Sequence, residues 1–329
     1  MTSRVLAALL GGTLGIAACS NVDLDAGSDR ARGPLPVDQR SPLVLSNDWP
    51  RDNWQGEFAM LFASAGQLQL AGIVVNASTI YPGLADNLAE WQAMANAAHA
   101  SGMRGIPDPI GSAGAPLERP ASGDIDATTP NGSEGAHFIV DTSARLASPV
   151  WPMVVATGGR LTDLADAYLL DHAVADRVVV VASSGQTSGQ TISTGWPNGD
   201  LDPWATSIVV AKFRYVQVNA YYPQVDDVPS SRAAQLPSNP FGAWMSSKLG
   251  DILAMDTATD QNSVIASAMP SFSLDVLRAS ALDGPQAAGE TPVLTAGIPG
   301  RVWSVSRGDN ASATARFWQL LRDPSTFGP

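Results

Sequence analysis

Short apolar runs alternate along the chain with longer segments in which apolar residues recur every three or four positions. The short runs, at residues 43–45 (LVL), 68–75 (LQLAGIVV), 150–156 and 178–181 (VVVV), are typical of buried strands. Helical spacing is clearest from Leu84 to Ala98, and Gly102 marks the expected end of that helix. The alternation predicts an α/β fold with a mostly parallel central sheet and helices on both faces.

The remaining pattern extends this prediction to the end of the chain. Helices are expected over residues 134–146, 162–170, from 203 onward, 241–253 and 312–321, and strands over 215–218 and 301–305. Thr162 and Asp202 have side chains suited to helix N-caps, and Pro203 suits a first helical position. Residues 104–132 are rich in Pro, Gly and Ala, so we expect a long surface loop that forms a rim or lid.

Length and charge limit the function classes. The chain has 329 residues, 45% of them hydrophobic and 15% charged, which is enough for one large α/β domain. Its net charge of -12 would repel a nucleic-acid backbone, so nucleic acid is excluded as a partner. The sequence has no Gly-x-Ser-x-Gly elbow, phosphate-binding loop or dinucleotide fingerprint. His99, His137 and His172 lack metal-ligand spacing, and we interpret them as structural or surface residues.

The first 19 residues are organised like a cleaved signal. Arg4 precedes an uncharged, mostly apolar run from Val5 to Ile16, and small residues then lead to Cys19, the only cysteine. This end resembles the lipobox of bacterial lipoproteins, which implies an extracytoplasmic protein attached to the membrane by a lipid on Cys19 alone. Residues 20–40 would be a flexible tether and 41–329 a single domain. An ordinary signal peptide and an uncleaved tail are the alternatives.

Oxygen-bearing side chains gather in residues 46–53 (SNDWPRDN), directly after the apolar run 43–45. In open α/β sheets, ligands bind at the carboxyl ends of the strands. Asp48, Asp52 and Asn53 in one such turn need a cation, a polyol or water to satisfy them. The turn therefore predicts a metal or polyol site. The alternative is that Asp48 and Asp52 cap the next helix or lie in a solvated turn.

This turn resembles the N-terminal signature of the inosine/uridine-preferring nucleoside hydrolases, Asp-x-Asp-Pro-Gly-x-Asp-Asp after a first strand. Asp48 and Asp52 take the second and third aspartate positions, and Asn53 takes the fourth. Ser46 stands at the first position, and the dipeptide Trp-Pro replaces Pro-Gly.

Later segments resemble the same family in order and spacing. Residues 153–158 (MVVATG) and 161–165 (LTDLA) are similar to V-A-x-G-P-L-T-N-I-A, with one extra residue after Gly158. Residues 177–185 are similar to its strand ending in Met-Gly-Gly, and 196–205 (WPNGDLDPWA) to A-E-F-N-x-x-x-D-P-x-A-A. Thr259-Asp260 stands where the family has His-Asp. The resemblance implies a nucleoside hydrolase-like, Rossmann-like architecture.

The resemblance also implies an activity, which is hydrolysis of N-glycosidic bonds in ribonucleosides or related glycosides with Ca²⁺ as cofactor. Asp48 would be the general base on a metal-bound water and a ligand of that metal. Asn53, Asp260 and the backbone carbonyl of Met153 would complete the metal shell. The substrate, a nucleoside or sugar, would be contacted by Asp52, Asn76, Trp196 and Asn198. The family commonly forms dimers or tetramers, which leaves a homo-oligomer open.

Three departures from the family pattern define the alternatives. Asn53 replaces an aspartate and loses a charge, which predicts weaker calcium binding. Trp196 replaces a glutamate, and an indole cannot accept hydrogen bonds from sugar hydroxyls. Thr259 replaces a histidine linked to leaving-group activation. One alternative is therefore a catalytically weakened sugar- or glycan-binding lipoprotein with the same fold, and another is a structural envelope protein.

Overall fold

The structure is a computed structural model. It describes residues 37, 41–51, 54–77, 83–182, 186–188, 191–193, 197–217, 230–249, 279–281, 286–287, 302–305 and 310–328. All of them belong to one compact unit, Pro34–Pro329. Among the helices in these ranges, none has the length and apolar character that a membrane span requires.

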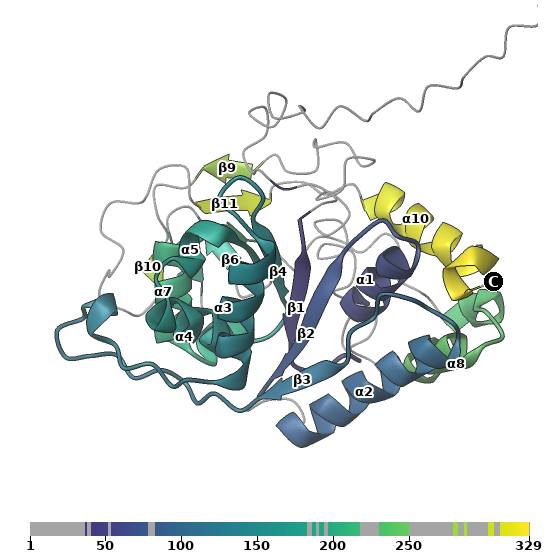
Figure 1. The fold of residues 1–329 in the computed structure, drawn as a ribbon, viewed down its shortest axis with the longest axis horizontal. Helices are drawn as coiled ribbons and strands as arrows, with labels where there is room; N and C mark the ends of the chain where they lie inside the picture. Colours follow the sequence, from purple (N-terminus) through teal and green to yellow (C-terminus); the bar gives the residue numbers. More distant parts are fainter. Residues whose placement is uncertain are drawn as a thin grey trace, which may run out of the picture. The chain divides into compact units, whose positions relative to one another are not determined.

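An eight-stranded sheet in the order β3-β2-β1-β4-β5-β8-β11-β9 forms the centre of this unit (Figure 1). The strands are β1 (Leu43–Asn47), β2 (Leu70–Asn76), β3 (Pro109–Ser112), β4 (Met153–Thr157), β5 (Val178–Ala182), β8 (Arg214–Gln217), β9 (Ala279–Ala281) and β11 (Val302–Val305). Each neighbouring pair from β3 to β11 is parallel, and β9 is antiparallel to β11. Strands β6 (Gln186–Ser188), β7 (Thr191–Ser193) and β10 (Gln286–Ala287) form a small second sheet.

Helices cover both faces of the main sheet. The helices are α1 (Gln55–Ser64), α2 (Leu84–Ala100), α3 (Glu134–Leu146), α4 (Thr162–Leu170), α5 (Val174–Arg177), α6 (Pro197–Asp200), α7 (Pro203–Lys212), α8 (Pro240–Lys248) and α10 (Asn310–Arg322), with 3-10 helices η2 (Ile125–Ala127), η3 (Ser230–Gln235) and η6 (Pro324–Phe327). The predicted α/β class, with its mostly parallel sheet and two helical layers, is confirmed.

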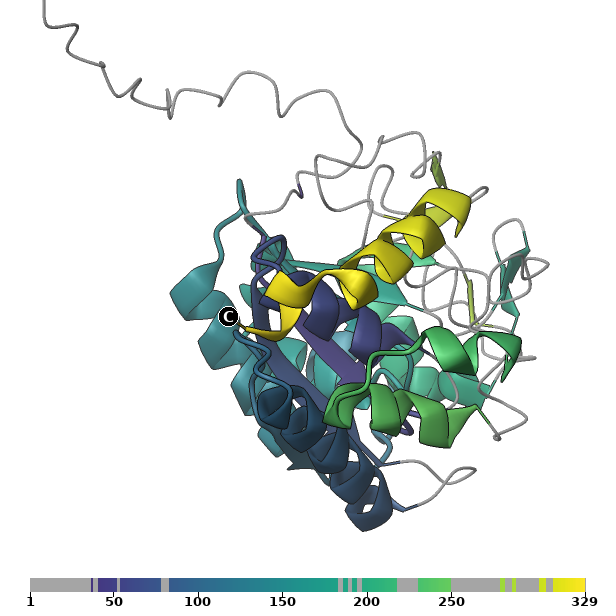
Figure 2. The same cartoon turned by 90° about the vertical axis from the view of Figure 1, so that its right-hand side faces the viewer.

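The alternation of side chains along β1 separates two hydrophobic cores. Leu43 and Leu45 join a core with α1, α2, α8 and α10, whereas Val44 joins a core with α3, α4, α5 and α7. Figure 2 views the first layer from outside, with α8 and α10 in front of α1. Because β1 is buried on both faces, its first three residues, LVL, are a continuous apolar run rather than an alternating one.

The structure corrects two predictions made from the pattern. Residues 104–132 are not one loop, because Pro109–Ser112 adds an edge strand to β2 and Ile125–Ala127 forms a 3-10 turn. Thr162 is the first residue of α4 rather than its cap, and its hydroxyl donates to Asp202 Oδ2 at 2.7 Å. The predicted cap at Asp202 is confirmed, because its side chain accepts a hydrogen bond from the backbone N–H of Ala205. Ser133 caps α3 in the same way, by accepting from the N–H of Ala136.

Candidate functional site

Asp48 lies at the point where the strand order reverses. The chain leaves β1 for its neighbour β2 and then β3, and it later returns to β4 on the opposite side of β1. The carboxyl ends of β1 and β4 therefore flank the crevice in which open α/β sheets bind ligands. Asp48 is the first residue after β1, so chain topology alone brings it to this crevice.

The backbone of Asp48 is held on both sides. Its N–H donates to Asn47 Oδ1 at 2.8 Å, and its carbonyl accepts from Trp91 Nε1 of α2 at 2.9 Å. Its carboxylate Oδ1 accepts from the Trp49 N–H at 2.8 Å. The side chain is fully buried, at 0% exposure. A buried carboxylate with a fixed backbone is suited to a role as base or ligand, because its orientation is set before a substrate arrives.

Asn76 ends β2, beside the end of β1. Its Nδ2 donates to Ser46 Oγ at 3.2 Å and to the Arg160 carbonyl at 3.4 Å. Its Oδ1 is buried and has no hydrogen-bond partner among the described residues. An unpaired buried acceptor is costly, and a hydroxyl or a cation would satisfy it. The predicted substrate contact at Asn76 is thus at the correct edge of the sheet.

A glycine turn after β4 joins these residues to Asn198. The Gly158 N–H donates to the Ser46 carbonyl at 3.1 Å, and Asn198 Nδ2 donates to the Gly158 carbonyl at 2.6 Å. A Cβ on Gly158 would lie 2.7 Å from Asn47 Nδ2, so the turn can approach β1 only without a side chain. The structure therefore brings Asp48, Asn76 and Asn198 to one edge of the sheet.

The prediction that the backbone carbonyl of Met153 is a metal ligand is wrong. Met153 begins β4, whereas the register pairs Ser46 with Thr157 at the other end of that strand. At about 3.3 Å per residue, Met153 lies ~13 Å before Thr157. Calcium ligands bind at 2.3–2.6 Å from the ion, so two of them are at most about 5 Å apart. The carbonyl of Met153 is at the amino edge of the sheet and cannot share a cation with Asp48.

Several predicted site residues lie outside the described ranges. These are Cys19, Asp52, Asn53, Trp196 and Asp260. Within the described ranges, no three His, Cys, Asp or Glu side chains are grouped to hold a metal ion. The oxygen donors that the structure does describe are Asp48 and neutral asparagine and backbone oxygens, which suit a hard cation such as Ca²⁺.

Buried carboxylates behind the glycine turn form a second polar group. Asp163 Oδ1 accepts from Ser112 Oγ at 2.6 Å and from Ser133 Oγ at 3.0 Å. Asp202 accepts from the Leu117 N–H at 2.9 Å. Burial raises the pKa of both Asp163 and Asp202, although the Arg160 guanidinium partly opposes this. Arg160 also donates to the Gly114 carbonyl, and its own carbonyl accepts from Asn76. Arg160 therefore connects the 104–132 segment to the end of β2.

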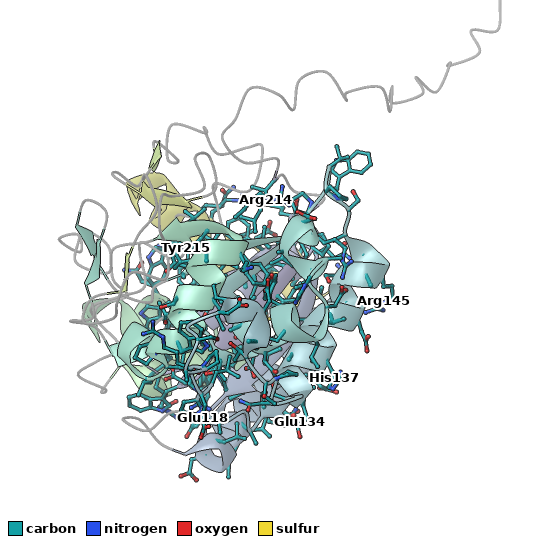
Figure 3. The ribbon with its side chains drawn as sticks, turned by 90° about the vertical axis from the view of Figure 1, so that its left-hand side faces the viewer. Glu118, Glu134, His137, Arg145, Arg214 and Tyr215 are labelled. Atoms are coloured by element: carbon teal, nitrogen blue, oxygen red, sulfur yellow. The ribbon has the colours of Figure 1, made fainter. Side chains whose placement is uncertain are left out.

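The three histidines lie away from this edge. His137 is exposed on α3, one turn from Glu134 and more than two turns from Arg145 (Figure 3). His99 contacts the Ile106 carbonyl at 3.0 Å, and His172 stacks on Tyr168 with ring centroids 4.5 Å apart. These contacts agree with a structural or surface role for all three.

Two residues near Asp48 were missed as site residues from the sequence. Trp91 belongs to the apolar positions at helical spacing, which predicts a core residue. Nothing in that pattern shows that its indole N–H donates to the Asp48 carbonyl. Lys248 had a signal, because it follows Phe241, Trp244 and Met245 at helical spacing and so occupies a core position of α8. A lysine at a core position is rare unless it is paired.

No protein-family model and no curated protein sequence matches this chain. Solved structures do. A purine-preferring ribonucleoside hydrolase from Gardnerella vaginalis has a TM-score of 0.59 at 13% identity, over 87% of this chain and 99% of that one. An inosine-guanosine nucleoside hydrolase has a TM-score of 0.61 at 12% identity, over 85% and 98%. The type III effector XopQ, in complex with adenosine diphosphate ribose, has a TM-score of 0.59 at 12% identity, over 88% and 94%.

These likenesses establish the fold. The chain is similar over most of its length to nucleoside hydrolases and covers nearly all of each of them. The expected nucleoside hydrolase-like architecture is confirmed, and at this identity the sequence counts as highly divergent from these proteins.

Proposed function

We propose that this protein is a calcium-dependent hydrolase of N-glycosidic bonds in ribonucleosides or related glycosides, with Asp48 as the general base. One observation carries the proposal. A fully buried carboxylate with a fixed backbone lies at the β1/β4 switch point of a fold that is shared with nucleoside hydrolases. The enzymes named above act on nucleosides according to their names, and we extend that substrate class to this chain.

The residues of the site divide the work of this reaction. Water adds to the anomeric carbon as the carbon–nitrogen bond breaks, through an oxocarbenium-like sugar, and the base leaves with the electron pair of that bond and takes up a proton from solvent. Asp48 would take the proton from that water. The amides of Asn76 and Asn198, together with Asp52, would hold the sugar hydroxyls, and Trp196 would stack on the sugar or base. Calcium, when bound by Asp48, Asn53 and Asp260, would supply positive charge that orients the sugar hydroxyls and acidifies water.

Replacing Asp48 tests the role of the base. Asp48→Asn keeps the size of the side chain and its hydrogen-bond acceptor at Oδ1 but cannot take a proton. Turnover of inosine, adenosine or uridine, measured as release of the free base, should fall by about 10²–10⁴-fold. Ribose should still bind, by calorimetry. Asp126→Asn, in the surface turn η2, is the matched control and should keep full turnover. An Asp48→Asn protein as active as the wild type would remove Asp48 as base.

A second candidate function is sugar or glycan binding without turnover. It is favoured by the sequence departures, since Asn53 and Trp196 replace two carboxylates that the resemblance would place in the site. Under this alternative, wild-type protein and Asp48→Asn would bind ribose alike, and neither would release base from any nucleoside. We also propose attachment to the cell envelope through an acylated Cys19, which mass spectrometry of the mature N-terminus would test.

A further inference from the structure

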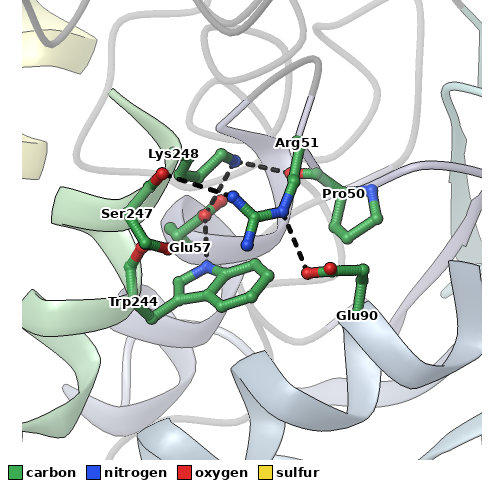
Figure 4. Close-up of polar contacts among 7 residues, drawn as sticks. All are labelled: Pro50, Arg51, Glu57, Glu90, Trp244, Ser247 and Lys248. Carbon is green, nitrogen blue, oxygen red and sulfur yellow. Dashed lines mark hydrogen bonds and ion pairs between the residues drawn. The ribbon is translucent and has the colours of Figure 1, made fainter. Parts of the chain in front are cut away.

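A buried lysine on α8 contacts the turn that follows Asp48. Lys248 is 0% exposed and donates from Nζ to the Pro50 carbonyl at 2.5 Å and to Glu57 Oε1 at 2.8 Å. Its ammonium also lies 4.3 Å from the centre of the Trp54 ring. Pro50, Trp54 and Glu57 all belong to the segment between Asp48 and the first turn of α1. Figure 4 shows Lys248 between Pro50 and Glu57.

The same helix supplies further contacts to this segment. Trp244 Nε1 donates to Glu57 Oε1 at 2.9 Å, so α8 directs two donors at one carboxylate oxygen. Arg51 lies over the Trp244 ring at 4.8 Å and bonds Glu90 of α2 at 2.9 Å (Figure 4). The turn is thus held from α2 at one side and from α8 at the other.

Stability alone does not explain a lysine here. The neighbouring core positions of α8 are apolar, and a buried ion pair generally contributes no more to stability than well-packed apolar residues of similar size. An apolar side chain in place of Lys248 could fill the space, but it could not donate to the Pro50 carbonyl. That donor is the property that only the lysine provides.

We propose that Lys248 is a positioning residue for the Asp48 site. Its ammonium fixes the Pro50 carbonyl and thereby the backbone of residues 48–51, which directly follow β1 and include the proposed base Asp48. Glu57 neutralises the ammonium, whereas the hydrogen bond to the Pro50 carbonyl comes from the lysine itself. This inference rests on the proposed function for its effect on ligands, but its effect on the turn is independent of that function.

A pair of variants separates positioning from simple packing. The double variant Glu57→Gln/Lys248→Met removes both charges together, so it leaves no buried ion unpaired and should be more stable than Glu57→Gln alone. Glu57→Gln alone breaks the ion pair but keeps the donor to Pro50. It should lose stability, because Lys248 stays buried with fewer partners. Lys212→Met, which removes a lysine ion pair with Asp126 elsewhere, controls for loss of a cation.

Two readouts on the full chain decide the proposal. The first is hydrogen exchange of peptides covering residues 48–57, and the second is calcium affinity by calorimetry, with and without ribose. The double variant should lose exchange protection in these peptides and bind calcium about 10- to 100-fold more weakly, as when residues that orient metal ligands are replaced. Glu57→Gln and Lys212→Met should keep both properties close to the wild type.

Wild-type protection and wild-type calcium affinity in the double variant would overturn the proposal, since the pair would then be packing only. A wild-type protein that binds calcium neither with nor without ribose would instead contradict the proposed function. The exchange measurement would still decide whether Lys248 fixes the turn.

Discussion

Trp91 both packs in the core and holds the proposed base. Its side chain is fully buried, and its Nε1 donates to the Asp48 carbonyl. Trp91→Phe should destabilise the fold by about 1–3 kcal/mol, through a small cavity and an unpaired carbonyl, measured by urea unfolding. It should also lower turnover, because the backbone of Asp48 loses a support.

Trp204→Phe provides the comparison for that variant. The Trp204 indole is also buried and donates to Thr128 Oγ1 at 3.0 Å, but on the other face of the sheet. Its loss should reduce stability by a similar amount and leave turnover unchanged. Equal loss of turnover in both variants would mean that Trp91 acts only through overall stability.

The buried carboxyl of Asp163 predicts a pH dependence of stability. Burial raises its pKa, so the folded state holds the proton more tightly than the unfolded state, in which the pKa is about 3.9. The contribution to stability is therefore fully present below that unfolded pKa and is lost as pH rises through the raised folded pKa. Asp163→Asn should make the decline in unfolding free energy above pH ~4 shallower, measured by urea unfolding across pH.

Asp126 should show the opposite sign. A hydrogen bond from Tyr168 and the neighbouring Lys212 lower the pKa of Asp126. Its contribution is present above the unfolded pKa and is lost as pH falls through the lowered folded pKa. Asp126→Asn should change only the acid side of the stability profile, and only slightly because the group is half-exposed. Stability profiles of both variants that run parallel to the wild type would contradict this assignment.

How far the site could be predicted differs between its residues. Asp48 and Asn76 come at the ends of apolar runs, and parallel strands bring such residues to one edge of the sheet. Their positions in the sequence alone therefore support their prediction as site residues. The prediction for Met153 failed because it followed the motif match alone, which placed a ligand at the start of β4, although ligands bind at the carboxyl ends of parallel strands. The Lys248 contact joins residues 198 apart, which no local pattern predicts.

At the scale of elements, α1 and α2 approach each other closely at Gly56. A Cβ there would lie 2.6 Å from Met94 Cε and 2.7 Å from Trp91 Cζ3. Gly56→Ala should therefore cost about 1–3 kcal/mol of unfolding free energy, because a packed core resists added volume. Thermal and urea unfolding would measure this loss.

Gly83→Ala is the matched substitution for Gly56→Ala. No heavy atom lies within 4 Å of a Cβ built at Gly83, so its effect on stability should be much smaller. If the two substitutions lowered the unfolding free energy equally, the close approach of α1 and α2 would not be the reason that position 56 requires glycine. A secondary effect on Asp48 is expected only for Gly56→Ala, since Trp91 is, with Met94, one of the two side chains that must move.

Most elements were predictable because their periodicity is strong. The run 178–181 and the spacing from Leu84 to Ala98 correspond directly to β5 and α2. The edge strand β3 was missed because its four residues, PIGS, combine a proline and a glycine with only one strongly apolar side chain. Its pairing with β2, rather than its own propensity, determines its conformation.

At the scale of the whole molecule, ligand binding should stabilise the fold. A ligand that binds only the folded state raises the unfolding free energy by about 2.7 kcal/mol at 100 times its Kd. Calcium should therefore raise the melting temperature of the wild type, and ribose should raise it further. Asp48→Asn should weaken the calcium response, whereas Asp126→Asn should not. A melting temperature that calcium leaves unchanged would contradict the proposed metal dependence.

The link between Lys248 and Pro50 also has a consequence for the order of events during synthesis. The Asp48 turn leaves the ribosome early, but its partner on α8 emerges only after another 198 residues, with every strand from β1 to β8 already made. A nascent chain that stops before residue 240 should therefore contain the base without the support for its turn. Capacity to bind ligand should therefore arise late, and not before α8 docks.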